Sequence, residues 1–267
     1  MSTLDEKRVY GEKAGRTELY VAAEMGVAVV SVSDDIVGEF TLDHRCTARD
    51  VAAGPDRLAV ATDEDVLVSA EGGYTGTAFG PAVAVGFDGD RLLAAGPDGR
   101  VAARTGEAWT DLGTVTDVRA IDGRLVAGKG GVYRADDDLT HVGLSDVRDV
   151  TGASQPLAAT GDGLYYLGPG WAAALDGAFS VVASGSAEGD PAHAATADAL
   201  YERDGETWVE RSLPVDGRVT DVTHGAGTYA VTAEGVVLVD AGDGFRDRAL
   251  GLRDVRAVEI APRAGGS

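Results

Sequence analysis

The residues of this chain best suited to chemistry recur within one short phrase. Five of its seven copies place an Asp before Val, and an Arg or a Thr precedes that Asp. Carboxylates gathered around one opening can hold a hard cation, and paired carboxylates can hydrolyse glycosidic bonds. Alternatively, each Asp accepts backbone N–H groups of its own loop or pairs with a neighbouring Arg, a structural role. The five are Asp50, Asp117, Asp149, Asp221 and Asp254, and the preceding arginines are Arg49, Arg148 and Arg253.

A second candidate site is the polar segment from His44 to Asp50, which holds a His, two Arg, an Asp and the single thiol, Cys46. A Cys–His–Asp nucleophile or half of a zinc site is conceivable there. Both fall short because no second Cys exists and the other three His lie in other repeats. We therefore assign no catalytic or metal-binding residue. We expect an inert, buried thiol, with Arg45 and Arg49 as the first choices for contacts to an anionic small molecule.

The elements that must position these residues follow from the spacing of the phrase. Its seven copies are about 34 residues apart, and each begins a unit of four short runs rich in Val, Leu, Tyr and Ala. Asp-Gly and Gly-Gly pairs between the runs close tight hairpins. An all-strand period of this length indicates a β-propeller. We therefore expect the phrase to form the innermost strand of each blade, with the Asp residues around the mouth of a central channel.

The two ends of the chain complete one blade between them. The segments 17–24, 26–31 and 37–42 supply the second to fourth strands of a blade that lacks a first strand, and 254–260 supplies that strand. Joining them removes the open sheet edges of an unclosed ring. The prediction is an all-β chain with a single seven-bladed propeller of four-stranded blades, closed by a C-terminal strand. Six blades remain an alternative if residues 179–214 are irregular. The predicted divisions are an N-terminal arm (1–16), the propeller (17–261) and a C-terminal tail (262–267).

Composition limits the partners and the setting. The net charge is −21, the pI is about 4.4, and only three of the 23 basic residues are Lys. Such self-repulsion destabilises a compact chain unless salt screens it, so the composition resembles that of proteins from salt-accumulating haloarchaea. No basic stripe suits a nucleic acid, and no apolar run is long enough to cross a bilayer. One cysteine and the absence of a signal-peptide pattern predict a cytoplasmic protein.

Short motifs and longer segments of the chain also resemble known families. The turns between third and fourth strands resemble the Asp-box repeat of sialidase-like propellers, as in 69–75, 134–140 and 204–208. In that family the box stabilises a hairpin and has no catalytic part. Almost end to end, the chain is similar to a family of uncharacterised haloarchaeal β-propellers of the Asp-box or WD40-like seven-bladed type. The segments that carry this likeness are 5–10, 18–22 and 44–50.

Two functions are consistent with these observations. The first is a protein-binding or scaffold module that holds an unknown partner protein on the rim or on a blade edge. The second is a small-molecule or cation binder, or a hydrolase-type enzyme, whose site is the channel mouth. We favour binding over catalysis and expect no resident cofactor, a cation at the Asp rim being the exception. The residues selected for binding are His44, Arg45, Arg49, Asp50, Asp117, Arg148, Asp149, Asp221, Arg253 and Asp254.

Overall fold

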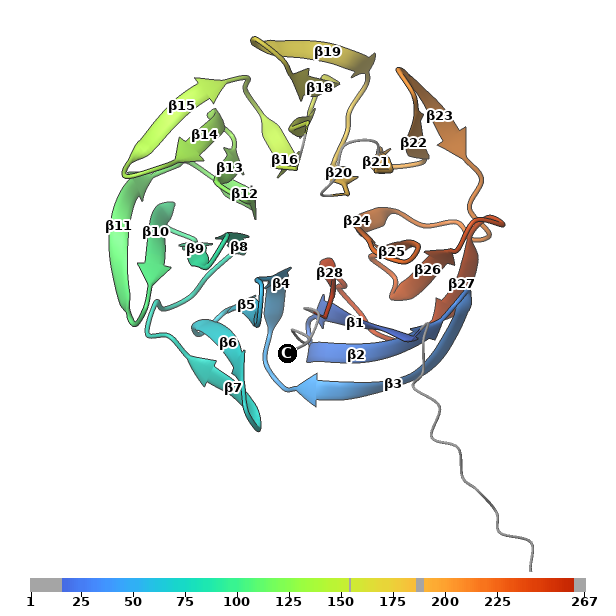
Figure 1. The fold of residues 1–267 in the computed structure, drawn as a ribbon, viewed down its shortest axis with the longest axis horizontal. Helices are drawn as coiled ribbons and strands as arrows, with labels where there is room; N and C mark the ends of the chain where they lie inside the picture. Colours follow the sequence, from blue (N-terminus) through green and yellow to red (C-terminus); the bar gives the residue numbers. More distant parts are fainter. Residues whose placement is uncertain (1–15, 154, 186–189, 262–267) are drawn as a thin grey trace, which may run out of the picture.

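The fold is a closed ring of seven antiparallel sheets around a central channel (Figure 1). This computed structural model describes residues 16–153, 155–185 and 190–261. Every regular element within these ranges is a β-strand, and no helix there could span a membrane. The predicted N-terminal arm (1–16) lies outside the described residues except for Arg16, and the predicted tail (262–267) lies wholly outside them.

Each blade contains four strands that follow one another from the channel outward. The innermost strands are β4 (Ala48–Ala53), β8 (Ala84–Asp88), β12 (Val118–Asp122), β16 (Val147–Thr151), β20 (Val181–Ser184), β24 (Val219–His224) and β28 (Ala257–Ile260). The second strands are β1 (Arg16–Ala23), β5 (Leu58–Thr62), β9 (Arg91–Ala95), β13 (Leu125–Gly128), β17 (Leu157–Thr160), β21 (Ala192–Ala195) and β25 (Thr228–Thr232).

The third strands are β2 (Gly26–Ser33), β6 (Val66–Ala70), β10 (Arg100–Thr105), β14 (Gly131–Ala135), β18 (Gly163–Leu167), β22 (Leu200–Asp204) and β26 (Val236–Asp240). The outer strands are β3 (Ile36–His44), β7 (Gly73–Gly76), β11 (Ala108–Thr114), β15 (Leu139–Gly143), β19 (Trp171–Asp176), β23 (Thr207–Arg211) and β27 (Arg246–Ala249).

The two ends of the chain share one blade, as predicted. Strand β28 pairs with β1, which continues into β2 and β3. Leu19 lies opposite Ile260 and Ala22 lies opposite Ala257. Strands β20 to β23, which fall within 179–214, form a regular four-stranded blade, so the count is seven rather than six.

The hydrophobic core lies between neighbouring blades. All residues of β5, β13, β17, β21 and β25 are buried, because second strands are covered on both faces. Small side chains let adjacent sheets approach: Ala59 and Ala61 pack against Val85 and Leu92 of the next blade. Outer strands such as β27 are exposed throughout. Packing between blades therefore stabilises the ring and fixes the orientation of each innermost strand.

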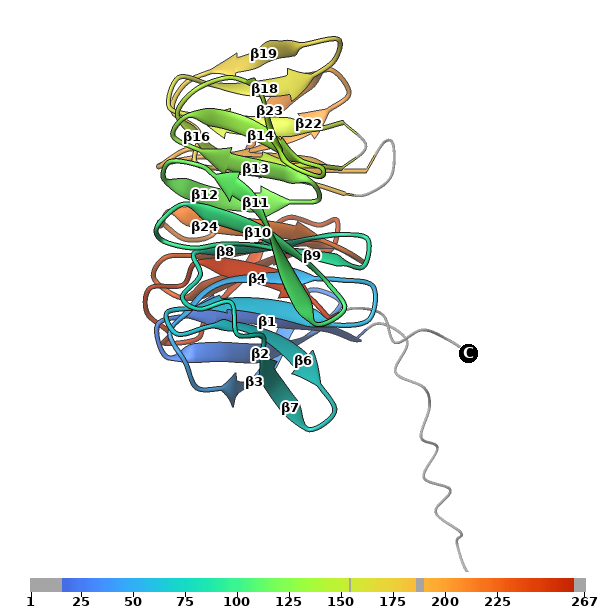
Figure 2. The same cartoon turned by 90° about the vertical axis from the view of Figure 1, so that its left-hand side faces the viewer.

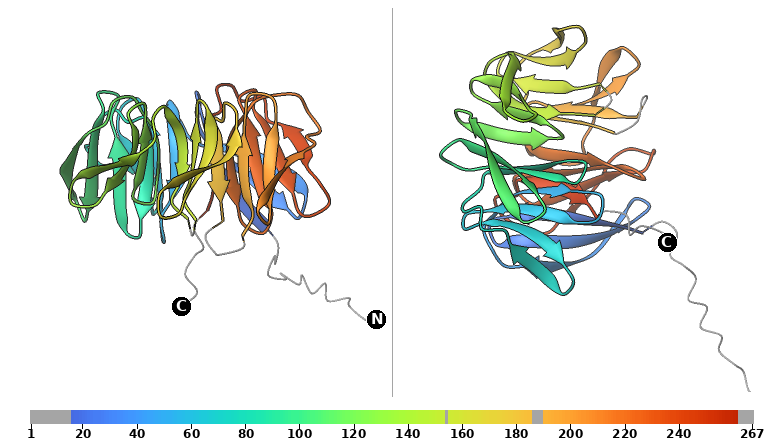
Figure 3. Two further views of the ribbon diagram at one scale, coloured as in Figure 1. Left: turned by 90° about the horizontal axis from the view of Figure 1, so that it is seen from above. Right: turned by 60° about the vertical axis from the view of Figure 1, so that its left-hand side comes forward.

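Seen from its edge, the ring is a disc whose strands run between two faces (Figures 2 and 3). We call the face where the innermost strands begin the entry face, and the face where they end the exit face. Strand β1 begins, and β28 ends, at the exit face, because Leu19 near the start of β1 pairs with Ile260 at the end of β28. The candidate site described next lies at the opposite, entry face.

Candidate functional site

A β-bulge at the start of the innermost strands shapes the mouth of the channel. In β4 the pairing with β5 passes from Ala48 to Asp50 and omits Arg49. The same irregularity occurs at Arg119, Arg148 and Thr220. A bulge gives one residue no partner in the ladder and redirects its side chain.

The remaining three blades repeat this geometry. In each, the residue just before the innermost strand and the first residue of that strand face a single residue of the second strand. Thus Val83 donates its N–H to the carbonyl of Ala95 while Ala84 pairs with the same Ala95. The bulge residues around the ring are Arg49, Val83, Arg119, Arg148, Ser180, Thr220 and Arg256, and all seven line a channel cavity of about 820 Å³.

Four of the seven bulge residues are arginines, which we call the arginine layer: Arg49, Arg119, Arg148 and Arg256. Three of them lie beside acidic residues of the turns that lead into the strands. Arg119 is 2.9 Å from Asp117 and 2.8 Å from Asp146, and Arg256 is 2.7 Å from Asp254. Arg148 lies 3.8 Å from Asp146, a longer ion pair.

Arg49 differs from the other members of the arginine layer. Within the part of the chain that the structure describes, its guanidinium makes no hydrogen bond or ion pair. It is half-buried and lines the cavity. Its donors are therefore available to a ligand.

Below the arginine layer, three carboxylates join neighbouring blades. Asp50 accepts the N–H of Val51 at 2.9 Å and that of Val85, in the next blade, at 2.9 Å. Asp149 does the same with Val150 and Val182, both at 2.8 Å. Asp221 accepts from Val222 at 2.7 Å and Val258 at 2.8 Å. Each side chain thus links two innermost strands through both of its oxygens.

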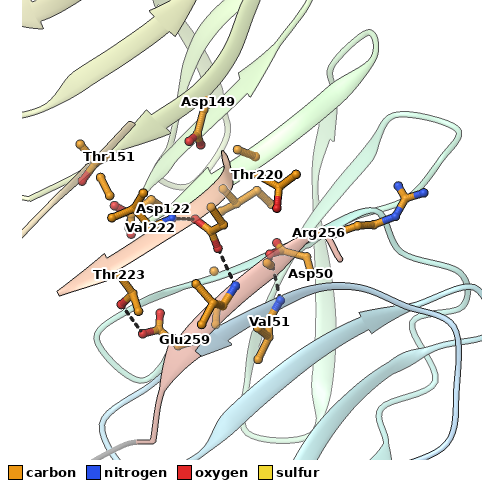
Figure 4. Close-up of a pocket in the computed structure, with 18 of the residues that line it drawn as sticks. Asp50, Val51, Asp122, Asp149, Thr151, Thr220, Val222, Thr223, Arg256 and Glu259 are labelled. Carbon is orange, nitrogen blue, oxygen red and sulfur yellow. Dashed lines mark hydrogen bonds between the residues drawn. The ribbon is translucent and has the colours of Figure 1, made fainter. Parts of the chain in front are cut away.

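Two further carboxyl groups lie deeper in the channel. Glu259 accepts the N–H of Ile260 at 2.7 Å and the hydroxyl of Thr223 at 3.0 Å. Asp122, which is exposed, accepts the N–H of Gly152 at 2.7 Å. Figure 4 shows Asp50, Asp122, Asp149 and Glu259 around one cavity. We call the five acids, Asp50, Asp122, Asp149, Asp221 and Glu259, the carboxylate layer.

Four of these acids hold their protons more firmly than ordinary carboxyl groups. Burial raises the pKa of Asp50, Asp149 and Glu259 to about 7, although backbone N–H groups act in the opposite direction. Burial also raises the pKa of Asp221 well above its usual value, and the charges of Asp149 and Asp50 add to this. The charge of Asp122 contributes to the raised pKa of Asp50, Asp149 and Glu259.

The structure corrects the register of the predicted Asp ring. Asp50, Asp149 and Asp221 share one register position, whereas Ala120 and Ala257 occupy it in the other two strands. Asp117 and Asp254 lie three residues earlier, in exposed turns, with left-handed φ values of 53° and 51°. They pair with arginines and do not join the buried three.

The segment 44–50 is divided between two environments. His44 lies against the ring of Tyr74, with centroids 5.0 Å apart, at the end of β3. Cys46 is half-buried, and burial raises the pKa of its thiol. Arg45 is exposed, as is Arg253, and neither lines the channel cavity. Only Arg49 and Asp50 of this segment do.

Several residues of the site were not among those selected from the sequence. They are Arg119, Arg256, Asp122 and Glu259. Aligning the copies on Val-Arg would have found them, because Val118-Arg119-Ala120-Ile121-Asp122 matches Val255-Arg256-Ala257-Val258-Glu259. Among the described residues, no group of three or more His, Cys, Asp and Glu side chains could hold a metal ion.

A histidine pair near the exit face was also missed. His193 Nδ1 and His224 Nε2 are 2.8 Å apart, and His193 is 1% exposed. Burial lowers the pKa of His193 to about 3 and that of His224 to about 4. Both rings are therefore neutral at pH 7 and bridge adjacent blades.

The ring, its closure and its charged channel define the class of protein: a seven-bladed β-propeller. Residues 3–261 match the model of a family described as "Beta-prop_HVO_0234:-like, beta propeller". The chain belongs to this family. A comparison with curated proteins gave no match.

Solved structures share the fold at low sequence identity. The WD40 β-propeller domain of Doa1 has a TM-score of 0.67 and 14% identity, over 82% of this chain and 88% of that one. A structure of YCF48 bound to D1 peptide has a TM-score of 0.56 and 11% identity, over 76% and 82%. The extracellular domain of the BT4673 protein of B. thetaiotaomicron has a TM-score of 0.56 and 11% identity, over 89% and 39%.

Proposed function

We propose that the protein is a binding module that holds an acidic segment of a partner protein over the arginine layer. The observation that carries this proposal is the repetition of Arg at one bulge position in four of seven blades. Five arginines line the channel cavity together with six acidic residues, in a chain whose net charge is −21. Guanidinium groups present fixed donors that fit carboxylates.

The geometry of the mouth supports a peptide-sized ligand. Arg49 has no partner within the described residues and lines the cavity, so a ligand would not first have to break an ion pair there. A propeller of similar fold, YCF48, has been solved with a peptide bound. The lone Cys46 and the acidic composition support a cytoplasmic, salt-rich setting for the same function.

A small anionic molecule in the channel is the second candidate. The cavity volume of about 820 Å³ falls within the range of small-molecule sites, about 300–1,000 Å³. This alternative places the ligand inside the channel rather than across the mouth. A competition experiment between an acidic peptide and a small anion distinguishes the two candidates.

The test is fluorescence anisotropy of an amidated hexa-aspartate peptide that carries an uncharged N-terminal fluorophore, with the full chain in the lowest KCl concentration that keeps the ring folded. Arg49→Gln should weaken binding about 5–10-fold, equivalent to about 1–1.4 kcal/mol. Arg203→Gln makes the same charge change on β22, outside the cavity lining, and should leave the affinity within about twofold of wild type.

Two outcomes would count against the proposal. Equal losses in Arg49→Gln and Arg203→Gln would show that the peptide responds to overall charge and not to the mouth. Binding of sulfate or citrate without binding of the peptide would favour the small-molecule alternative. A hexa-lysine peptide serves as the control for non-specific attraction to the acidic surface.

A further inference from the structure

We propose that anion binding at the arginine layer is coupled to proton uptake by the carboxylate layer, so that binding tightens as the pH falls. This inference rests on the proposed function, since it concerns the regulation of the same mouth. The physical basis begins with the position of the two layers. Arg49 directly precedes Asp50, and Arg148 directly precedes Asp149. Both layers line the same cavity, so an anion held there lies close to both.

The hydrogen bonds of the carboxylate layer fix its members in place. Asp50, Asp149 and Asp221 each use both oxygens to hold two innermost strands together. They cannot turn away from one another without breaking a contact between blades. The repulsion among them must therefore be relieved by a proton or by the positive charges above.

The arginines line the same cavity as these acids. Positive charge close to a carboxyl group favours its ionised form. An anion that binds the arginines neutralises part of this charge and adds its own negative charge nearby. Both changes favour the protonated form of the carboxyl groups, whose pKa values already lie near 7 for Asp50, Asp149 and Glu259.

Other charged and titratable groups lie around the same cavity. His224 remains neutral near pH 7 because burial lowers its pKa to about 4. Acids of the preceding turns form ion pairs with Arg119, Arg148 and Arg256. The groups are Arg49 and Asp50 on β4; Arg119 and Asp122 on β12; Arg148 and Asp149 on β16; Asp221 and His224 on β24; Glu259 on β28; Arg256 directly before β28; and Asp117, Asp146, Arg218 and Asp254 in the turns.

The direction of the effect follows from linkage. If the bound state holds more protons than the free state, the association constant rises as pH falls. An uptake of about half a proton gives about a threefold increase per pH unit. The pH dependence of the association constant is strongest near pH 7, above the pH at which ordinary carboxyl groups titrate.

The experiment is isothermal titration calorimetry of the full chain with the same blocked hexa-aspartate peptide, between pH 6.5 and 8.5. Its carboxyl groups stay ionised throughout this range. Comparing MOPS with imidazole, two buffers that hold pH 7, differ in ionisation enthalpy and are not inorganic oxyanions, measures the protons taken up. We expect uptake at pH 7 and binding about threefold to tenfold tighter at pH 6.5 than at pH 7.5.

Asp122→Asn is the matched variant. Asp122 is exposed, lies outside the arginine layer, and accepts one N–H bond that the Asn oxygen can replace. Removing its charge lowers the pKa of the remaining acids. We expect proton uptake at pH 7 to be smaller in this variant than in wild type. Circular dichroism of the variant confirms that the ring is folded.

The outcomes separate this inference from the proposed function. If the peptide does not bind at any pH, the proposed function fails and the coupling fails with it. If the peptide binds through Arg49 but with no proton uptake and a flat pH dependence, only the coupling is wrong. If uptake occurs but is identical in Asp122→Asn, the proton goes elsewhere and the carboxylate layer is not its acceptor.

Discussion

At the scale of residues, two Asp side chains from similar phrases have different physical roles. Asp149 accepts two backbone N–H groups, one in each of two blades. Asp149→Ala leaves both donors without an acceptor, and each unmet buried donor costs about 1–3 kcal/mol. We therefore expect the variant to lose about 2–4 kcal/mol of unfolding free energy, measured by urea denaturation at pH 7.5.

Asp117→Asn is the comparison. Asp117 is exposed with a φ of 53°, a conformation that Asn tolerates well. The change removes an exposed ion pair to Arg119, worth about 0.2–1 kcal/mol. If Asp149→Ala and Asp117→Asn lost the same unfolding free energy, the different register positions of the two Asp residues would not affect stability.

The register could not be obtained from the repeated phrase because the phrase overlaps itself. Residues 146–150 read Asp-Val-Arg-Asp-Val, so either Asp can be aligned with Asp117. Only the hairpin pairing shows that Asp149, and not Asp146, lies opposite Ala159 at the position of Asp50. The two alignments differ by the position of the bulge. No residue type marks that position in the sequence, since Arg, Thr, Ser and Val all occupy it.

At the scale of elements, strand β28 determines whether the ring is closed. It contributes four residue pairs to β1 and is also linked to β24 by the bond from Val258 to Asp221. A chain that ends at Arg256 would expose the edges of β1 and leave Asp221 without its second donor. We expect this chain to aggregate and to unfold at a lower temperature, because unpaired edges associate with other chains.

A chain that ends at Ala261 keeps β28 and provides the control. Size-exclusion chromatography with light scattering measures association, and circular dichroism measures the melting temperature. A monomeric chain ending at Arg256 with an unchanged melting temperature would contradict the role given to β28.

Closure itself was predictable from the sequence, because the first segment of the chain lacks a first strand and the last segment supplies one. Asp122 and Glu259 occupy matching positions in the Val-Arg copies of the phrase, but the burial that raises the pKa of Glu259 is visible only in the folded ring.

At the scale of the whole molecule, charge sets the conditions under which the ring is stable. A net charge of −21 on 267 residues produces repulsion that falls as salt shortens the Debye length from about 10 Å at 0.1 M to about 3 Å at 1 M. We expect the melting temperature to rise between about 0.1 M and about 2 M KCl. For a chain of this size, each kcal/mol gained raises the melting temperature by about 2–4 °C.

The control for this prediction is sucrose, which favours compact states without screening charge. A melting temperature that rises with sucrose but not with KCl would show that repulsion between surface acids does not limit stability. Calorimetry at constant pH makes this comparison directly.

The shared blade also determines how the ring would respond to mechanical force. Leu19 near the start of β1 lies opposite Ile260 at the end of β28, and the pairs Tyr20–Glu259, Val21–Val258 and Ala22–Ala257 follow in order. A pull on the two ends of the chain would therefore break the pairs between β1 and β28 one after another. The pairing that closes the ring is therefore the one that a pull on both chain ends would load pair by pair.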